Sequence, residues 1–242
     1  MSTGKYLVLD IDATLVHTHD VDEDGVRGIE KFSMLNIYSE KDRIKYRRNL
    51  YLMKIIDVNH ASGTGEVTTL TGIYRPFLRL FLDFCKNYFE GVVVWSAGQK
   101  KYVEKMVEIM FPHANFQPMV VYTYEDCIVG NDDYLKKPLS KLYKDKRLKG
   151  KLNEKNTMIL DDRDDTFSLN PKNGVQIPVF ESDMSIEDIS GHEDINFLKF
   201  MAWLNTKEVK NATDVRKLKK DKVFDKSLEA YNKLLKEEKK KA

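Results

Sequence analysis

Short apolar runs alternate with stretches of helical periodicity along most of the chain. The runs occupy residues 6–10, 92–95, 119–123, 157–161 and 175–180. Their nearly continuous hydrophobicity is typical of strands that are covered on both faces, as in parallel sheets. Strands that alternate with helices in this way predict an α/β fold, in which helices flank a mostly parallel sheet.

The helical stretches between these runs carry their apolar residues on one face. Residues 75–89 begin near Pro76, which is favourable in the first turn of a helix, and continue with a helical apolar stripe. A second helix is expected to end at Pro112. Residues 185–204 predict a further helical stretch, interrupted near Gly191.

The interval from His17 to Gly72 departs from this alternation of strands and helices. A βα unit normally passes from strand to helix within a few residues, but here about fifty residues intervene. Residues 44–58 and 66–74 are rich in β-branched and aromatic residues and predict strands. We therefore expect a small β insert at about residues 18–72. It follows the first strand directly, where loops surround the ligand crevice of open α/β sheets.

Three cations alternate within this insert, at Arg43, Lys45 and Arg47. In a strand they would share one face, which would suit a phosphorylated or acidic peptide. A solvated face without a partner explains the pattern equally well.

Composition limits the class of protein. With 242 residues, 42% of them apolar and 32% charged, the chain can bury a sizeable core. No stretch approaches the roughly 18 apolar residues of a transmembrane helix, and the first ten residues lack a signal-peptide pattern. An intracellular protein, nuclear or cytoplasmic, with no membrane partner is therefore predicted. Cys85 and Cys127 fit no metal-ligand spacing and are expected to stay reduced.

Charge divides the chain into a domain at 1–205 and a basic helical extension at 206–242. From Asn205 onward there are thirteen Lys and Arg against seven Asp and Glu, although the net charge of the whole chain is only +2. Such a tail could contact nucleic acid or an acidic partner, but interleaved acids favour a solvated helix. Helical spacing predicts that one face of it packs on the domain, through Phe224, Leu228, Tyr231 and Leu235.

Polar residues end three of the predicted strands. If the sheet is parallel, Asp10, Ser96 and Asp161 meet at one edge, and Asp12 lies on the same side as Asp10. A lone D-x-D could merely end a strand at a turn. The second acidic group, at 161–165, favours a metal site over a simple turn. Clustered carboxylates repel one another unless a cation neutralises them, and Mg²⁺ prefers oxygen ligands of this kind.

Four ordered motifs resemble one family. "DIDAT" at 10–14 matches the D-x-D-x-T/V signature of the haloacid dehalogenase superfamily, and "LVLDIDATLVHT" at 7–18 is similar to its FCP/SCP branch. This branch comprises phosphatases of the RNA polymerase II carboxy-terminal domain, also described as NLI-interacting-factor-like. Residues 74–98 and 158–177 resemble later motifs of the same branch, and the resemblance extends from Lys5 to Leu204.

The resemblance implies a fold and a chemistry. The fold would be the Rossmann-like parallel sheet of this superfamily. Asp10 would be the nucleophile that forms an aspartyl-phosphate, and Asp12 the general acid and then base. Mg²⁺ would be bound by Asp10, the backbone carbonyl of Asp12, and Asp162, with Asp161 supporting the metal site and a lysine.

The resemblance also implies a phosphate-binding set of Thr14, Ser96 and a lysine. In "YLKKPLSKL" at 134–142 the K-x-L-S spacing selects Lys137, whereas counting from the tyrosine selects Lys136. We prefer Lys137, because the following helix would fix its approach to the phosphate.

The function expected from this resemblance is a Mg²⁺-dependent phosphoserine/phosphothreonine protein phosphatase, with a phosphorylated protein or peptide as its partner. A nucleotide or polynucleotide phosphatase, or a non-catalytic binding module on the same fold, are the alternatives. His17 and His19 form an H-x-H pattern, for which a structural role is favoured over metal binding.

Overall fold

The computed structural model describes residues 3–19, 49–57, 63–112, 115–182 and 194–240. Arg43, Lys45, Arg47 and the predicted helix interruption near Gly191 lie outside these residues. Among the described helices, none has the length and apolar character that crossing a bilayer requires.

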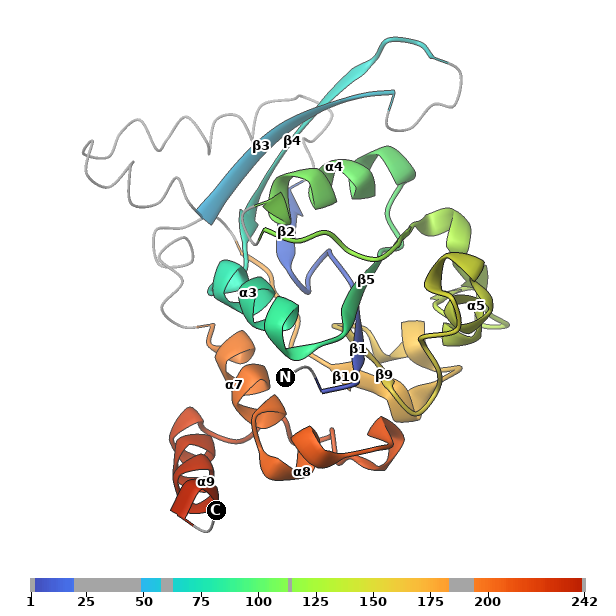
Figure 1. The fold of residues 1–242 in the computed structure, drawn as a ribbon. Helices are drawn as coiled ribbons and strands as arrows, with labels where there is room; N and C mark the ends of the chain where they lie inside the picture. Colours follow the sequence, from blue (N-terminus) through green and yellow to red (C-terminus); the bar gives the residue numbers. More distant parts are fainter. Residues whose placement is uncertain (1–2, 20–48, 58–62, 113–114, 183–193, 241–242) are drawn as a thin grey trace, which may run out of the picture.

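A five-stranded parallel sheet, here called the main sheet, forms the centre of the molecule (Figure 1). Its order is β10-β9-β1-β5-β6, with β1 paired to both β5 and β9. The predicted runs supply all five strands: β1 at Tyr6–Leu9, β5 at Gly91–Trp95, β6 at Val121–Tyr122, β9 at Thr157–Asp161 and β10 at Gly174–Gln176. The predicted α/β class and parallel sheet are confirmed.

The last strand, β10, ends well before its apolar run does. The run at 175–180 pairs with β9 only as far as Gln176. Pro178 follows two residues later and has no N–H to donate to a ladder, so a strand cannot continue regularly through it.

Helices cover both faces of the main sheet, as expected for parallel strands. One face packs on α3 (Leu78–Tyr88), α4 (Lys100–Met110) and α7 (Asn196–Leu204). The other face packs on α5 (Leu139–Lys144) and the short helices η5 (Lys146–Leu148) and η6 (Asp164–Phe167). The parallel sheet therefore lies between two helical layers (Figure 1).

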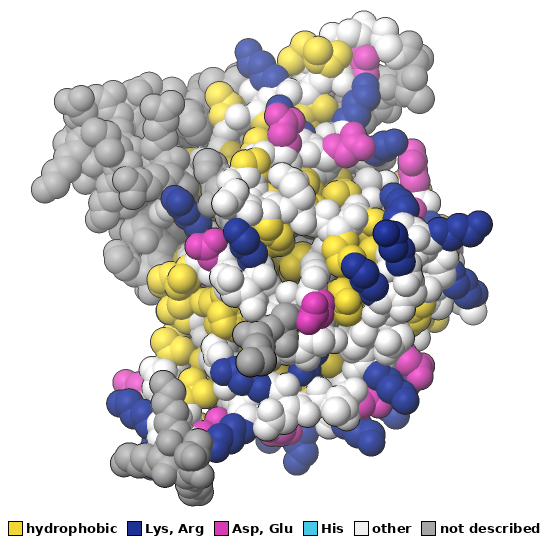
Figure 2. All heavy atoms as spheres, viewed as in Figure 1, with side chains coloured by type: hydrophobic (Ala, Val, Ile, Leu, Met, Phe, Trp, Pro, Cys, Tyr) yellow, Lys and Arg dark blue, Asp and Glu magenta, His cyan; other side chains and the backbone are white. Residues whose placement is uncertain are grey.

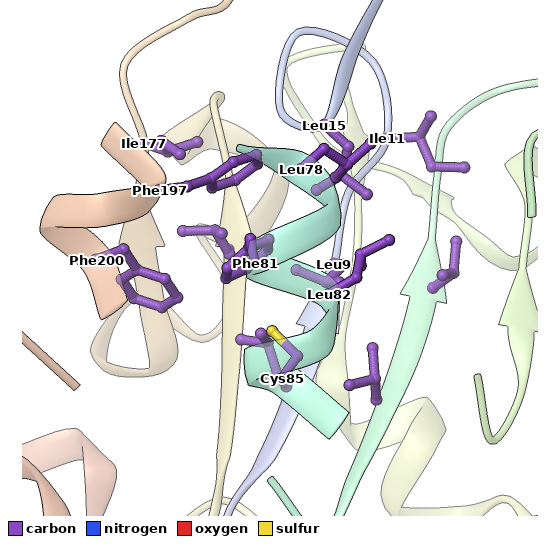
Figure 3. Packing of buried hydrophobic residues seen from close by; sticks show 14 of the residues in the cluster. Leu9, Ile11, Leu15, Leu78, Phe81, Leu82, Cys85, Ile177, Phe197 and Phe200 are labelled. Atoms are coloured by element: carbon purple, nitrogen blue, oxygen red, sulfur yellow. The ribbon is translucent and has the colours of Figure 1, made fainter. Parts of the chain in front are cut away.

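Helix α3 joins the main sheet to α7 through its apolar stripe (Figure 3). Phe81 stacks on Phe197 with the ring centroids 4.2 Å apart, and Phe200 lies against the same ring. The helix begins at Leu78, not at Pro76, because Phe77 takes a left-handed conformation with φ of 65°. Cys85 in this helix is a buried free thiol, and Cys127 is also free, as predicted.

A second, antiparallel sheet lies beside the main sheet and is here called the insert sheet. It consists of β2 (Val16–His19), β4 (Val67–Tyr74) and β3 (Leu50–Ile56), in that order. Its β3–β4 pair extends away from the body of the molecule (Figure 1). These strands agree with the predicted insert after the first strand, and β3 contacts α4.

Smaller elements complete the chain. A two-stranded ribbon pairs β7 (Ile128–Val129) with β8 (Leu135–Lys136). Single 3₁₀ turns form η4 (Tyr124–Asp126), η7 (Pro171–Asn173) and η8 (Val215–Lys217).

The basic C-terminal segment packs on the domain. It contains α8 (Lys207–Asn211) and α9 (Leu228–Lys240), and α9 contacts α7. Tyr231 is 1% exposed, and Leu228 and Leu235 pack against the same core. Phe224 also packs there but precedes the helix, contrary to the predicted helical register. On the face shown in Figure 2, Lys and Arg side chains are spread among acids over the coloured surface.

Candidate active site

The candidate active site lies where β1, β5 and β9 end. Asp10 and Ser96 directly follow β1 and β5, and Asp161 is the last residue of β9. Since β1 lies between the other two strands, the three side chains reach the same edge of the main sheet. All three are buried, with Asp10 6% exposed and Ser96 and Asp161 each 1% exposed.

The chain turns sharply after Asp10 and enters the insert sheet. Leu15 donates its N–H to the Ile11 carbonyl at 2.7 Å, and Ala13 donates to the Val16 carbonyl at 2.8 Å. Ala13 takes a left-handed conformation with φ of 55°, which is uncommon for a residue with a Cβ. This turn brings Asp12 back to the edge at which Asp10 lies.

The side chain of Arg75 holds this turn in place. Its guanidinium donates to the carbonyl of Thr14 at 3.1 Å and to the carbonyl of Pro178 at 2.7 Å, and it pairs with Asp194 at 2.9 Å. The residue is 1% exposed. An arginine can be buried in this way because the N–H groups of its planar guanidinium donate to carbonyl and carboxylate oxygens.

Of the two adjacent lysines, Lys137 enters the site. Its Nζ lies 2.5 Å from Oδ1 of Asp10 and 2.6 Å from Oδ2 of Asp161. Lys136 points elsewhere and pairs with Asp132 at 2.6 Å and Asp165 at 3.5 Å. Lys136 is the last residue of β8 and Lys137 directly follows it. Successive residues of an extended segment face opposite sides, which separates the two side chains.

Three buried carboxylates form a compact group. One oxygen from each of Asp10, Asp161 and Asp162 lies within 4.8 Å of the others, and this is the one such acidic or metal-ligating group among the described residues. Burial raises the pKa of Asp10 well above its usual value, against the opposing charge of Lys137. Burial likewise raises the pKa of Asp162, and the charge of Asp161 adds to that effect.

When all three carboxyls are ionised, the charges of this group do not balance without a cation. Burial alone would lower the pKa of Lys137, but Asp10 and Asp161 outweigh it and raise that pKa, so the lysine is charged. One ammonium group therefore faces three carboxyls. Carboxylate oxygens at this spacing, with a negative surplus, fit a divalent cation bound by hard oxygen ligands.

Asp12 has different surroundings. Its Oδ1 accepts hydrogen bonds from the hydroxyls of Tyr102 and of Thr18, the latter at 3.2 Å, and its Oδ2 lies 3.5 Å from Oγ of Ser96. Burial raises the pKa of Asp12, and the hydrogen bond from Tyr102 opposes that rise. Its side chain is not part of the three-carboxylate group.

Ser96 is held in place by the turn that follows it. Its Oγ accepts the N–H of Gly98 at 2.9 Å. A Cβ on Gly98 would lie 2.9 Å from the Tyr102 ring and 3.1 Å from Oγ of Ser96, so the close approach requires glycine there.

Comparison with known proteins identifies the domain. The family model of the NLI interacting factor-like phosphatases matches residues 5–216 of the chain. The chain belongs to this family. The match reaches eleven residues beyond the boundary that we predicted at residue 205. No curated protein sequence matches the chain.

Solved structures agree with the fold of an NLI interacting factor-like phosphatase. One is the fission yeast RNA polymerase II CTD phosphatase Fcp1, as a variant bound to beryllium fluoride. It has a TM-score of 0.53 and 19% identity over 74% of this chain. Another, described as the structure of Fcp1, an essential RNA polymerase II CTD phosphatase, has a TM-score of 0.53 and 16% identity over 97% of the chain. The chain spans 42% and 62% of the lengths of these two relatives.

Membership of the phosphatase family confirms the resemblance inferred from the motifs, and the structure adds contacts that the motifs did not contain. Thr14, predicted to bind phosphate, donates to Oδ1 of Asp162 at 3.1 Å and accepts the N–H of Asp162 at 3.0 Å. Its single hydroxyl proton is therefore used on a carboxylate, and contact with phosphate stays a prediction.

Sequence reasoning missed two hydroxyl-bearing residues of this family site. Tyr102 lies in the helix predicted to end at Pro112 and Thr18 at the start of the predicted insert, and neither was given a chemical role. His17 and His19 contact each other edge to face at 4.6 Å on β2 and are not members of the carboxylate group. Arg163 pairs with Asp165 at 2.9 Å in the loop after β9.

Proposed function

We propose that this chain is a Mg²⁺-dependent phosphoserine/phosphothreonine phosphatase that works through an aspartyl-phosphate. The observation that carries the proposal is the contrast between Asp10 and Asp12. Asp10 lies beside the ammonium group of Lys137 and within the three-carboxylate group, where that charge and a bound cation would favour an ionised nucleophile. Asp12 lies outside that group and is surrounded by hydroxyls, as a separate proton donor needs.

The reaction would proceed in two displacements. An Asp10 carboxylate oxygen attacks the phosphorus while the bond to the seryl or threonyl oxygen breaks, and Asp12 gives its proton to that leaving oxygen. Asp12 then takes a proton from the water that attacks the phosphorus. The second displacement releases inorganic phosphate and restores the Asp10 carboxylate.

The remaining side chains would stabilise charge. Lys137 and the hydroxyl of Ser96 would bind the phosphoryl oxygens that gain charge. Asp10, Asp162 and the backbone carbonyl of Asp12 would hold Mg²⁺, with Asp161 in support. When bound, the cation would reduce the repulsion between the phosphate and the carboxylate that attacks it.

The substrate class follows from the relatives and from the insert sheet. The two solved relatives are described as RNA polymerase II CTD phosphatases, and we carry a phosphorylated protein tail of that kind to this chain as its proposed substrate. An antiparallel sheet beside the site offers an extended surface suited to a peptide. A nuclear or cytoplasmic location belongs to the same proposal.

A phosphatase assay tests the proposal. Wild-type protein would be compared with Asp10→Asn on phosphoserine peptides, p-nitrophenyl phosphate and a 3′-phosphorylated oligonucleotide, with and without Mg²⁺. We expect Mg²⁺-dependent activity that falls by more than about 1,000-fold in Asp10→Asn. Asp164→Asn, which removes an exposed acid of the same loop system, is the matched control and should stay active.

Three outcomes would contradict parts of the proposal. Activity retained in Asp10→Asn would exclude Asp10 as nucleophile. Preference for the oligonucleotide would favour the polynucleotide phosphatase alternative. Peptide binding without turnover would favour a binding module. The presence of Asp10, Asp12 and Lys137 argues against that alternative.

A further inference from the structure

Three hydroxyls from three different elements converge beside Asp12. Thr18 comes from β2, Tyr51 from β3 and Tyr102 from α4. The Thr18 hydroxyl lies 2.6 Å from that of Tyr51 and 2.5 Å from that of Tyr102. Tyr51 is 5% and Tyr102 8% exposed, so the cluster is largely shielded from water. The insert sheet is thereby joined to the candidate general acid by hydrogen bonds.

The number of hydroxyl protons determines which group donates in each contact of this cluster. Each hydroxyl has one proton to donate, and Tyr102 donates its proton to Oδ1 of Asp12. The proton in the short contact between Thr18 and Tyr102 must therefore be that of Thr18, which shares it with Oδ1 of Asp12 at 3.2 Å. The contact between Thr18 and Tyr51 must then use the proton of Tyr51, whose contact with the His17 carbonyl is longer, at 3.4 Å. All three donors point along the cluster toward Oδ1.

The two oxygens of Asp12 are consequently unlike. Oδ1 is occupied as an acceptor, whereas Oδ2 lies on the side of Ser96, at 3.5 Å from its Oγ. Ser96 directly follows β5 at the edge where Asp10 lies. A proton that passes to a leaving oxygen near Asp10 would therefore leave from Oδ2.

We propose that Tyr102, supported by Thr18 and Tyr51, is a positioning residue that holds Asp12 with Oδ2 directed toward the leaving oxygen. This inference rests on the proposed function, since it requires Asp12 to be the general acid. It gives the insert sheet a part in catalysis, because Thr18 and Tyr51 belong to that sheet.

A misplaced general acid affects substrates unequally, whereas a simple loss of packing does not. An alkoxide from phosphoserine is a poor leaving group and needs a proton, whereas p-nitrophenolate leaves readily without one. A misplaced Asp12 should therefore slow phosphoserine cleavage much more than p-nitrophenyl phosphate cleavage. The value to compare is kcat/KM, which excludes the later hydrolysis of the aspartyl-phosphate.

The experiment compares wild type with Tyr102→Phe on a phosphoserine peptide, phenyl phosphate and p-nitrophenyl phosphate. We expect kcat/KM to fall by about 10- to 100-fold on the peptide and on phenyl phosphate, and by less than about 3-fold on p-nitrophenyl phosphate. Thr18→Val and Tyr51→Phe should show the same selectivity with smaller losses. In an Asp12→Asn background, Tyr102→Phe should add no further loss.

Tyr74→Phe is the matched control. The Tyr74 ring lies 5.1 Å from that of Tyr51, but its hydroxyl makes no hydrogen bond within the described part of the chain. It should leave all three rates unchanged.

Equal losses on every substrate, or no loss, would overturn the inference, and thermal unfolding would show whether equal losses reflect a damaged fold. If Tyr102→Phe does not fold, Thr18→Val provides the same comparison. A wild-type protein that cleaves none of the substrates would overturn the proposed function and this inference together. Selective loss in Tyr102→Phe with an active wild type supports both.

Discussion

The two halves of the active site hold their carboxylates in different ways. Asp10 lies beside the ammonium group of Lys137 and two further buried aspartates, so full charges determine its environment. Asp12 is held by the neutral hydroxyls of Thr18 and Tyr102. Two acids separated by one residue can thus have separate tasks, because a turn sends them to different neighbours. The charged half should respond to cations, and the hydroxyl contacts of the other half should not.

Removing Lys137 should give the largest effect. Lys137→Met leaves Asp10 and Asp161 buried without their ammonium partner, and losing one member of a buried pair costs about 3–5 kcal/mol. We expect a loss of that order in the free energy of unfolding, measured in denaturant with EDTA present, together with loss of phosphatase activity.

Lys136→Met is the matched control for this prediction. Its partner Asp132 is half exposed, with 51% of that side chain accessible, so the pair is screened by water. The unfolding free energy and the activity should change little. Similar effects of the two substitutions would contradict the assignment of Lys137 to the charged half.

Adding a divalent cation should stabilise the charged half. A ligand present at 100 times its Kd stabilises the folded state by about 2.7 kcal/mol, and we expect Mg²⁺ to raise the midpoint of thermal unfolding accordingly. Asp162→Asn should abolish this rise, whereas Asp164→Asn should retain it. A rise that survives in Asp162→Asn would place the cation elsewhere.

Stability should also depend on pH in a direction set by the charged half. The folded-state pKa of Asp10 and of Asp162 lies above the usual 3.8, so between that value and the raised pKa the folded state binds more protons than the unfolded state. Without metal, the free energy of unfolding should therefore fall as pH rises above about 4, by about 1.4 kcal/mol for each unit of pKa difference.

Asp10→Asn sharpens this test, because it removes one of the groups responsible, whereas Asp12 and Asp162, whose pKa values burial also raises, stay in place. Denaturant titrations at several pH values in EDTA should show a weaker fall in this variant. Added Mg²⁺, which binds the ionised carboxylates, should oppose the fall in wild type. A fall of equal size in Asp10→Asn would point to other groups.

The smallest effect is expected in the hydroxyl half. Tyr51→Phe removes one neutral hydrogen bond to Thr18, which is worth about 1 kcal/mol in unfolding free energy. Stabilisation by Mg²⁺ should be the same as in wild type. A changed response to Mg²⁺ in this variant would contradict the separation of the two halves.

Much of the fold could be predicted because it depends on local patterns. Continuous apolar runs predicted all five strands of the main sheet, and helical spacing predicted α3 and α4. The ends of elements were less well predicted. Phe77 directly precedes α3 with a left-handed backbone, and Phe224 packs on the core before α9 begins. Apolar spacing predicts neither of these helix starts.

The residues of the site, too, could be predicted only in part. Acids at strand ends could be found from the sequence, since parallel strands bring their carboxyl ends to one edge whatever lies between them. The partners of Asp12 could not be found, because Thr18 lies in the predicted insert and Tyr102 in a predicted helix, and the sequence does not show which acceptor their hydroxyls meet. Whether a buried tyrosine hydroxyl meets a carboxylate depends on how α4 and the insert sheet pack together.

The sequence by itself determined the order of the strands along the chain, the acids that end them and the family to which their spacing belongs. Tertiary structure decided between Lys137 and Lys136, of which Lys137 reaches Asp10, and it decided that Thr14 binds Asp162 and that the hydroxyls of Thr18 and Tyr102 hold Asp12. The physical reason is distance. Periodicity assigns a side chain to a face, but a hydrogen bond or ion pair forms only within about 3 Å, and that spacing is set by the packing of segments far apart in the chain.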